Sequence, residues 1–155
     1  MPKTRRVAVA TAAATAALAL TATVVVLVRP LPVTPVALPP DDAAPEQVVD
    51  AYTRALAGHD CATASALRTP AGSSTWCADV AALTEVQVGA GTVEDPAWSG
   101  HTPDQTVVNV PVTFDVEWRA FRADGSMDEG PTTWGYLLVR DTTTDPWRIV
   151  DEGVG

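Results

Sequence analysis

The two cysteines, Cys61 and Cys77, carry the most specific chemistry that the residue types of this chain allow. A disulfide between them would close a loop of about 15 residues and stabilise the fold by about 3 kcal/mol. Such a bond persists in an oxidising compartment, so it becomes available if this part of the chain is exported. Two buried thiols are the alternative.

The other residues with reactive side chains are spaced in ways that match no known motif. The two histidines, His59 and His101, and the two cysteines show neither C-x-x-C nor H-x-x-x-H pairing, so we expect no metal site. Ser73 and Ser74 lack the G-x-S-x-G context of a hydrolase nucleophile. No glycine-rich phosphate loop is present in the sequence, and we therefore expect no cofactor.

Charge is distributed unevenly along the chain. Every acidic residue lies at or after Asp41, and from there on nineteen acidic residues stand against six arginines and no lysine, a net charge of −13. A field of this sign repels phosphate backbones, so we expect no nucleic-acid partner. The same acidity keeps a surface domain soluble.

The N-terminal region has the pattern of a membrane anchor. A basic tail, residues 1–6, precedes an uncharged run, residues 7–28, that consists only of Ala, Val, Leu and Thr. At about 1.5 Å per residue, a helix over this run reaches about 33 Å, close to the hydrocarbon thickness of about 30 Å. Arg29-Pro30 ends the run, because a charge resists burial and proline cannot continue a helix. We therefore predict a transmembrane helix over residues 7–28.

The basic residues that flank this run predict its orientation. Three of them precede the run and one follows it, so the positive-inside bias places the N-terminus in the cytoplasm and the rest of the chain outside. We therefore expect a single-pass protein of the cell membrane. A cleaved signal peptide is the alternative, because Ala17-Leu18-Ala19 has the small-x-small form of a cleavage site, and cleavage would give a secreted protein. Both interpretations place the domain outside the cytoplasm.

A Pro-rich linker, residues 29–45, follows the hydrophobic run and contains six prolines. This composition favours extended polyproline geometry at about 3.1 Å per residue. We interpret the linker as a semi-rigid spacer of about 50 Å that holds the domain clear of the lipid head groups.

The folded domain, residues 46–155, begins with helical periodicity. Its first helix starts at Pro45 and stops at Gly58, with apolar residues on one face. Asp60 is placed to cap a second, short helix. Residues 74–82 predict a third helical segment.

The second half of the domain changes to a period of two. Residues 107–118 alternate between apolar and polar side chains over a dozen positions, and Pro111 indicates an edge strand or a bulge there. Helices followed by consecutive strands predict an α+β fold, with N-terminal helices packed on one face of an antiparallel sheet of about four strands. The other predicted strands cover residues 83–93, 132–140 and 147–151, and a hairpin loop begins at residues 123–126.

Three segments carry a family resemblance: residues 46–52 (EQVVDAY), the aromatic strand 134–139 (WGYLLV) and the closing segment 145–151 (DPWRIVD). With the order of the elements, they resemble the nuclear transport factor 2-like (SnoaL-like) superfamily, in particular exported or membrane-anchored actinobacterial members of unknown function. The resemblance implies a curved, cone-like sheet, wrapped by the helices around an apolar pocket. The superfamily includes isomerases, dehydratases and non-catalytic binding domains, so the fold alone does not select a function.

Enzymes of this superfamily place a carboxylate base and a tyrosine or acid donor inside the cone. The resemblance makes Asp151 and Tyr52 the candidate catalytic pair. Asp151 shares strand parity with Trp147 and Ile149, so it can point inward. A carboxylate buried in an apolar pocket has a raised pKa, which a general base near neutral pH requires.

We expect a non-catalytic function for this domain: membrane-anchored, it binds a protein partner of the cell envelope or a small apolar ligand. A cone-type isomerase or dehydratase-like enzyme acting on a hydrophobic substrate is the alternative. A structural domain whose cone is filled by its own side chains is a third possibility. We interpret Trp98, in a separate loop, as a lid over the pocket or as an anchor for a partner. The residues expected to line the pocket are Tyr52, Phe114, Trp118, Trp134, Tyr136 and Trp147.

Overall fold

The computed structural model describes residues 31–70, 76–120 and 127–153. The basic tail, the hydrophobic run 7–28 and the hairpin loop at 123–126 therefore lie outside the described residues. The chain divides into two compact units, Met1–Leu31 and Pro32–Gly155, and every described helix and strand belongs to the second. Among the described residues, no helix has the length and apolar character needed to span a membrane.

Two helices open the domain where the sequence predicts them. Helix α2, Pro45–Ala57, begins where the Gln47 side chain accepts the Ala44 amide at 2.8 Å, and it ends at Gly58. Helix α3, Cys61–Ala66, is capped by Asp60, whose Oδ1 accepts the Thr63 amide at 3.2 Å. Both helices therefore begin at side-chain capping interactions, and the Asp60 cap is the one that the sequence indicates.

The third predicted helical segment, residues 74–82, is wrong in most of its described part. Only Trp76–Ala78 is helical, as the single 3-10 turn η2, and strand β1 begins at Val80. Val80 and Ala82 pair with residues of strand β3, so backbone pairing in the sheet overrides the weak local preference for a helix. The first two residues of the predicted segment lie outside the described part of the chain.

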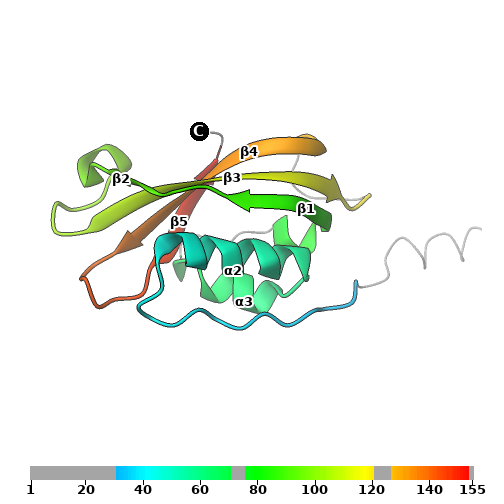
Figure 1. Cartoon of the computed structure of the whole chain (residues 1–155), viewed down its shortest axis with the longest axis horizontal. Helices are drawn as coiled ribbons and strands as arrows, with labels where there is room; N and C mark the ends of the chain where they lie inside the picture. Colours follow the sequence, from blue (N-terminus) through cyan, green and yellow to red (C-terminus); the bar gives the residue numbers. More distant parts are fainter. Residues whose placement is uncertain (1–30, 71–75, 121–126, 154–155) are drawn as a thin grey trace, which may run out of the picture. The chain divides into compact units, whose positions relative to one another are not determined.

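The sheet is open and antiparallel, with the order β1-β3-β4-β5 and the short β2 also beside β3 (Figure 1). Every strand pair in it is antiparallel, and the long strand predicted from period two lies at its centre. The α+β prediction is confirmed. The strands are β1 Val80–Val88, β2 Thr92–Glu94, β3 Thr106–Trp118, β4 Gly130–Arg140 and β5 Arg148–Gly153.

Pro111 lies in the central strand, so the expectation of an edge strand is wrong. The reason that a proline is tolerated there is a gap in the neighbouring pairing, because β1 ends opposite Val112 and β2 begins opposite Asn109. The Pro111 carbonyl accepts the Gly89 amide at 2.8 Å within this gap. Since N and O of one residue point to the same side of an antiparallel strand, the missing N–H of Pro111 faces the break.

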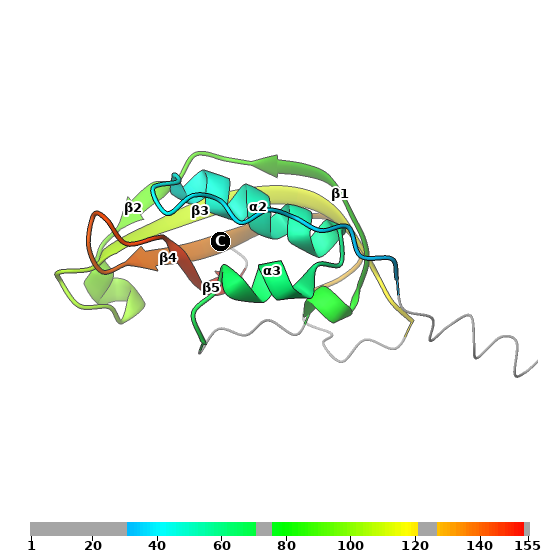
Figure 2. The ribbon, with the colours of Figure 1, turned by 90° about the horizontal axis from the view of Figure 1, so that it is seen from below.

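The core lies between the sheet and the two helices. Figures 1 and 2 show α2 and α3 on the same face of the sheet, with the strands behind them in the second view. Strand β3 turns one alternating set of side chains into this core, as its period of two predicts. The buried residues of β3 and β4 in the core are Val108, Val110, Val112, Phe114, Val116, Tyr136 and Leu138.

The described part of the Pro-rich linker lies against the domain, which corrects our interpretation of the linker as a spacer. The Thr34 amide donates to the Gly58 carbonyl at 2.8 Å, and the Val36 amide donates to Asp60 Oδ2 at 3.0 Å. Thr63 Oγ1 donates to the Val36 carbonyl at 3.1 Å. A Cβ added at Gly58 would meet the Thr34 carbonyl at 2.7 Å, so this close approach needs a glycine.

These contacts make Asp60 a junction between the linker and α3. Its two carboxylate oxygens accept the Val36 and Thr63 amides. The bond from Val36, followed by those from Thr63, holds the pKa of the Asp60 carboxyl below its usual value. The linker contact is therefore present above that lowered pKa and is lost as the pH falls through it.

The predicted disulfide is present. Cys61 at the start of α3 is bonded to Cys77 in η2, with a Cα–Cα distance of 5.7 Å that lies within the usual range. The bond joins the helical layer to the segment that leads into β1.

Reduction of this bond in the full chain is expected to lower the free energy of unfolding by about 3 kcal/mol, because the reduced unfolded chain regains the entropy of an open loop. Urea unfolding with and without a reductant measures the loss. A C61A/C77A variant is the control: it should show a similar loss and no response to the reductant. An unchanged midpoint for the wild-type chain under reductant would contradict the bond.

Candidate functional site

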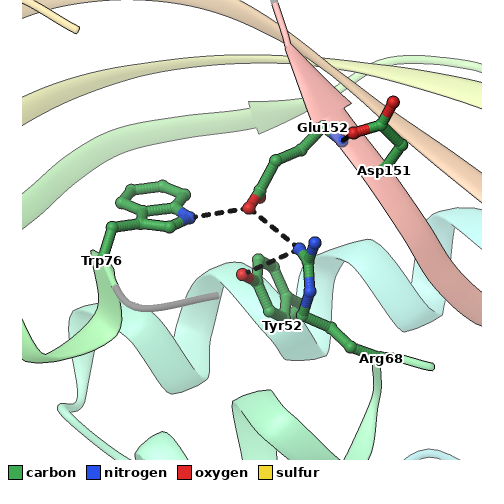
Figure 3. A network of polar contacts seen from close by, with 5 residues as sticks. All are labelled: Tyr52, Arg68, Trp76, Asp151 and Glu152. Atoms are coloured by element: carbon green, nitrogen blue, oxygen red, sulfur yellow. Dashed lines mark hydrogen bonds and ion pairs between the residues drawn. The ribbon is translucent and has the colours of Figure 1, made fainter. Parts of the chain in front are cut away.

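A buried ion pair lies beneath the sheet, between Arg68 and Glu152 (Figure 3). Arg68 Nη1 and Glu152 Oε1 are 3.0 Å apart, and the two side chains are only 6% and 14% exposed. Removing two charges from water costs several kcal/mol per ion, so such a pair needs good geometry and further hydrogen bonds to persist.

Two aromatic side chains supply those hydrogen bonds. Arg68 Nη1 also donates to the Tyr52 hydroxyl at 3.3 Å, and Trp76 Nε1 donates to Glu152 Oε1 at 3.0 Å. The Arg68 guanidinium carbon lies 5.7 Å from the centre of the Tyr52 ring. The four residues come from α2, the segment after α3, η2 and β5, so the network joins parts that are distant in the sequence.

Main-chain pairing positions Arg68 next to the last strand. Arg68 forms an isolated parallel bridge with Ile149 of β5. The Thr69 amide donates to the Ile149 carbonyl at 3.0 Å, and the Ile149 amide donates to the Leu67 carbonyl at 3.0 Å. The backbone on both sides of Arg68 is thus fixed to β5, and the disulfide fixes η2, which carries Trp76, to α3.

An irregularity in β5 turns Glu152 inward. Leu137 pairs with Asp151 and Leu138 pairs with Ile149, so one extra residue, Val150, lies between two consecutive pairs. An extra residue of this kind reverses the alternation of side chains beyond it. Asp151, which we expected to point inward, is exposed, and its Oδ1 accepts the Glu152 amide at 2.8 Å. Figure 3 shows the two carboxylates leaving β5 in opposite directions.

A cavity of about 260 Å³ opens beside the ion pair. Of the six aromatic residues expected to line a pocket, only Trp118 and Trp134 line this one. The other four, Tyr52, Phe114, Tyr136 and Trp147, are buried in the core, and Phe114 lines a different cavity of about 320 Å³. The lining residues are Arg68, Trp76, Trp118, Met127, Trp134, Asp151 and Glu152.

Tyr136 adds a hydroxyl to the interior whose hydrogen bond is not satisfied within the described part of the chain. The residue is fully buried, opposite Glu152 in the strand register, and its ring stands edge-on to Tyr52 at 5.3 Å. Burial, with smaller contributions from Tyr52 and Glu152, raises the pKa of Tyr136 well above its usual value. Trp134 Nε1 likewise finds no acceptor among the described residues.

A larger cavity, of about 580 Å³, lies on the other face of the sheet. Its lining includes Leu137 and Val139, which alternate along β4 with the core residues Tyr136 and Leu138. Ser99 and His101 line its other side, but Trp98 does not and is 87% exposed. Trp98 thus lines neither of these two cavities.

Within residues 31–70, 76–120 and 127–153, no three side chains of His, Cys, Asp or Glu lie close enough together to hold a metal ion. No protein-family model matches the chain, and no curated protein or solved structure was found to be similar to it. What the site can do is therefore argued from its geometry.

Arg68, Trp76 and Glu152 are the site residues that sequence reasoning missed. Arg68 carried only a weak signal: it directly follows Leu67 at a helix end, where a cation ordinarily stays exposed and interacts with the last helix carbonyls. Glu152 carried no such signal, because its direction depends on the irregularity at Val150.

The R68M variant is expected to unfold more easily by about 3–5 kcal/mol, because it leaves the Glu152 carboxylate buried without its cation. Urea unfolding of the full chain measures the loss, and R54M is the matched control. Arg54 pairs with Asp50 at 2.9 Å on the surface, with side chains 60% and 51% exposed. Loss of such a pair costs about 0.3–0.5 kcal/mol. Equal losses for R68M and R54M would contradict a buried pair.

The two tyrosines provide a second comparison. Y52F removes the acceptor of an arginine hydrogen bond and should cost about 1.5–3 kcal/mol, whereas Y136F removes a hydroxyl without a described partner and should change stability by less than about 0.5 kcal/mol. Chemical unfolding of both variants measures this difference. A large loss in Y136F would show that its hydroxyl has a partner after all.

The Y52F chain contains Tyr136 as its only tyrosine, so its alkaline absorbance titration reports on that residue alone. The folded pKa is raised, so the unfolded chain loses its proton first as the pH rises through about 10, and stability falls above that pH. Ionisation should therefore coincide with unfolding. Ionisation near pH 10 in the folded protein would contradict the burial.

Proposed function

We propose that this chain is a non-catalytic binding protein of the cell envelope, which holds a small, partly apolar molecule in the cavity beside the Arg68–Glu152 pair. In this proposal residues 7–28 anchor the protein in the membrane, with the N-terminus in the cytoplasm and the domain outside. Secretion after cleavage of the hydrophobic run is the alternative, and it leaves the domain in the same compartment.

The disulfide supports an exported domain. Bonds such as Cys61–Cys77 are rare in the reducing cytosol and common in proteins of oxidising compartments. The hydrophobic run and its flanking charges independently predict that the domain lies outside the cytoplasm.

Membership of the nuclear transport factor 2-like superfamily is also a proposal. It is supported by the order of the elements, with two helices first and a run of antiparallel strands after them. It is further supported by the position of both helices on one face of the sheet, which is the arrangement that a cone requires (Figure 2). Since this fold serves several functions, the proposed function depends on the cavity and not on the fold.

The observation that carries the proposal is the cavity at the ion pair. The cavity has a volume of about 260 Å³ and lies beside an ion pair whose side chains are only 6% and 14% exposed. A cavity of about 150 Å³ is enough to hold benzene. Trp76, Trp118, Trp134 and Met127 provide the apolar part of the wall. Arg68, Asp151 and Glu152 provide a polar part at least as large, which can orient a ligand.

The carboxylates near this cavity favour binding over catalysis. Glu152 Oε1 is already engaged within the fold, since it is paired with Arg68 and accepts a hydrogen bond from Trp76. Asp151 is exposed, and the Tyr52 hydroxyl is engaged by Arg68. The alternative, an isomerase or dehydratase-like enzyme acting through Asp151 and Tyr52, therefore has less support.

A probe experiment tests the proposal on the full chain in lipid nanodiscs. The fluorine NMR spectrum of added fluoroindole should show a signal from protein-bound probe. This signal should differ from that of probe dissolved in the lipid of empty nanodiscs. M127W places a larger side chain in the cavity wall and should lower the affinity at least tenfold, or about 1.4 kcal/mol.

V93W is the matched control, because Val93 is exposed and lies outside the cavity lining. It introduces the same side chain and should leave the bound signal unchanged. Absence of a bound signal in the wild-type chain, or equal binding by V93W and M127W, would overturn the proposal. Thermal unfolding of both variants verifies that they remain folded.

A further inference from the structure

Trp98 is exposed although the turn that carries it is well ordered by hydrogen bonds. The indole lies 87% exposed on the 3-10 turn η3, Pro96–Ser99, and Val93 of the neighbouring strand is also exposed. This turn lies at one end of the sheet, away from the two helices (Figure 1). A large aromatic side chain in this position gains free energy when a partner buries it.

Hydrogen bonds hold the turn on both sides of Trp98. Asp95 Oδ1 accepts the Ala97 amide at 3.0 Å, and the Trp98 amide donates to the Asp95 carbonyl at 3.0 Å. The His101 amide donates to the Pro96 carbonyl at 2.9 Å, with Gly100 in the left-handed conformation between them. A side chain presented on such a turn loses little backbone entropy on binding.

Two further bonds tie the flanking loops to the rest of the domain. Gln105 Nε2 donates to Asp141 Oδ1 at 2.7 Å, which joins the loop after η3 to the loop between β4 and β5. The Gly91 amide donates to Glu46 Oε1 at 2.8 Å, which joins the start of β2 to α2. The position of Trp98 is therefore set by the fold and not by a free loop.

Acidic residues outnumber basic ones around the turn that carries Trp98. Glu94, Asp95 and Asp104 lie within ten residues of it in the sequence. The cavity next to Ser99 and His101 is lined by two arginines, Arg140 and Arg148, and by three aspartates, Asp141, Asp145 and Asp151. A hydrogen bond from the Thr102 side chain, together with one from its own backbone amide, holds the pKa of Asp104 below its usual value. We call Val93, Glu94, Asp95, Trp98 and Asp104 the acidic tip.

We propose that the acidic tip is a docking surface for another protein, whose apolar cleft receives Trp98 and whose rim carries lysine or arginine. Tryptophan in the centre of an interface is a common source of binding energy, and complementary charges around it set specificity and the association rate. Anionic lipid head groups do not fit an acidic surface, and a second copy of this chain would bring two acidic tips together. This surface is separate from the cavity at Arg68 and Glu152, so neither proposal depends on the other.

Photo-crosslinking in the native host identifies the partner. Benzoylphenylalanine, a large aromatic side chain that can enter the same cleft, replaces Trp98 in the chain, and a second strain carries it at Val33, which is exposed on the linker. A protein crosslinked from position 98 but not from position 33 is identified by mass spectrometry and purified. The crosslink alone does not decide the matter, so the affinity of that protein for the full chain in nanodiscs is then measured.

W98A should weaken this affinity at least about 30-fold, as expected for a hot-spot tryptophan, whereas V33A should leave it unchanged. E94Q/D104N should slow association and flatten its dependence on salt, with a smaller effect on dissociation. Asp95 is left intact in this variant because it caps the turn.

Four outcomes would overturn the proposal: crosslinks from position 98 to lipid only, crosslinks to a second copy of this chain, no crosslink at all, or an identified protein that binds W98A as tightly as the wild-type chain. Vesicles of neutral and of anionic lipid, tested with the same variants, separate membrane adsorption from protein docking. Fluoroindole binding by W98A remains as in the wild-type chain if the cavity and the acidic tip are independent.

Discussion

The structure depends on bringing one arginine and one glutamate together away from water. Arg68 and Glu152 are far apart in the sequence, and their hydrogen-bonded network needs α2, η2 and β5 to be in place at once. An uncompensated charge in this interior would be costly, so incomplete assemblies that bury only one partner are disfavoured. The disulfide fixes Cys77, which is next to Trp76 in the sequence, to α3. The main-chain bridge fixes Arg68 beside Ile149 of β5.

The sequence predicts most of the fold because its local signals are strong and agree with one another. Pro45 and Gly58 bound the first helix, Asp60 caps the second, and the period of two along 107–118 gives the central strand and its inward face. The errors occur where the local structure depends on a strand that is distant in the sequence. Residues 80–82 joined the sheet because β3 lies beside them, and Pro111 is tolerated in the centre of the sheet because β1 and β2 leave a gap there.

The site was less predictable than the fold, for reasons that particular residues show. The rule of alternation is reliable only along regular strands, and one additional residue at Val150 reversed it, exchanging the roles of Asp151 and Glu152. Tyr52 was expected in the interior and lies there, but as the hydrogen-bond acceptor of an arginine whose burial depends on tertiary contacts. Trp98 shows the converse: its sequence context is compatible with a covered ring, and only the three-dimensional arrangement reveals that nothing described covers it.

The docked linker changes where the domain should be taken to begin. Sequence composition places the boundary at Pro45, whereas the compact unit begins at Pro32. A fragment cut at Pro45 would lack the strand-like segment that lies over Gly58, and would leave that glycine, which has no side chain of its own, uncovered. Such a fragment would also lose Val36 and Ala43 from the edge of the core. Expression of the domain for crystallisation or NMR should therefore retain the proline-containing residues upstream, which belong to the folded unit even though their composition is that of a tether.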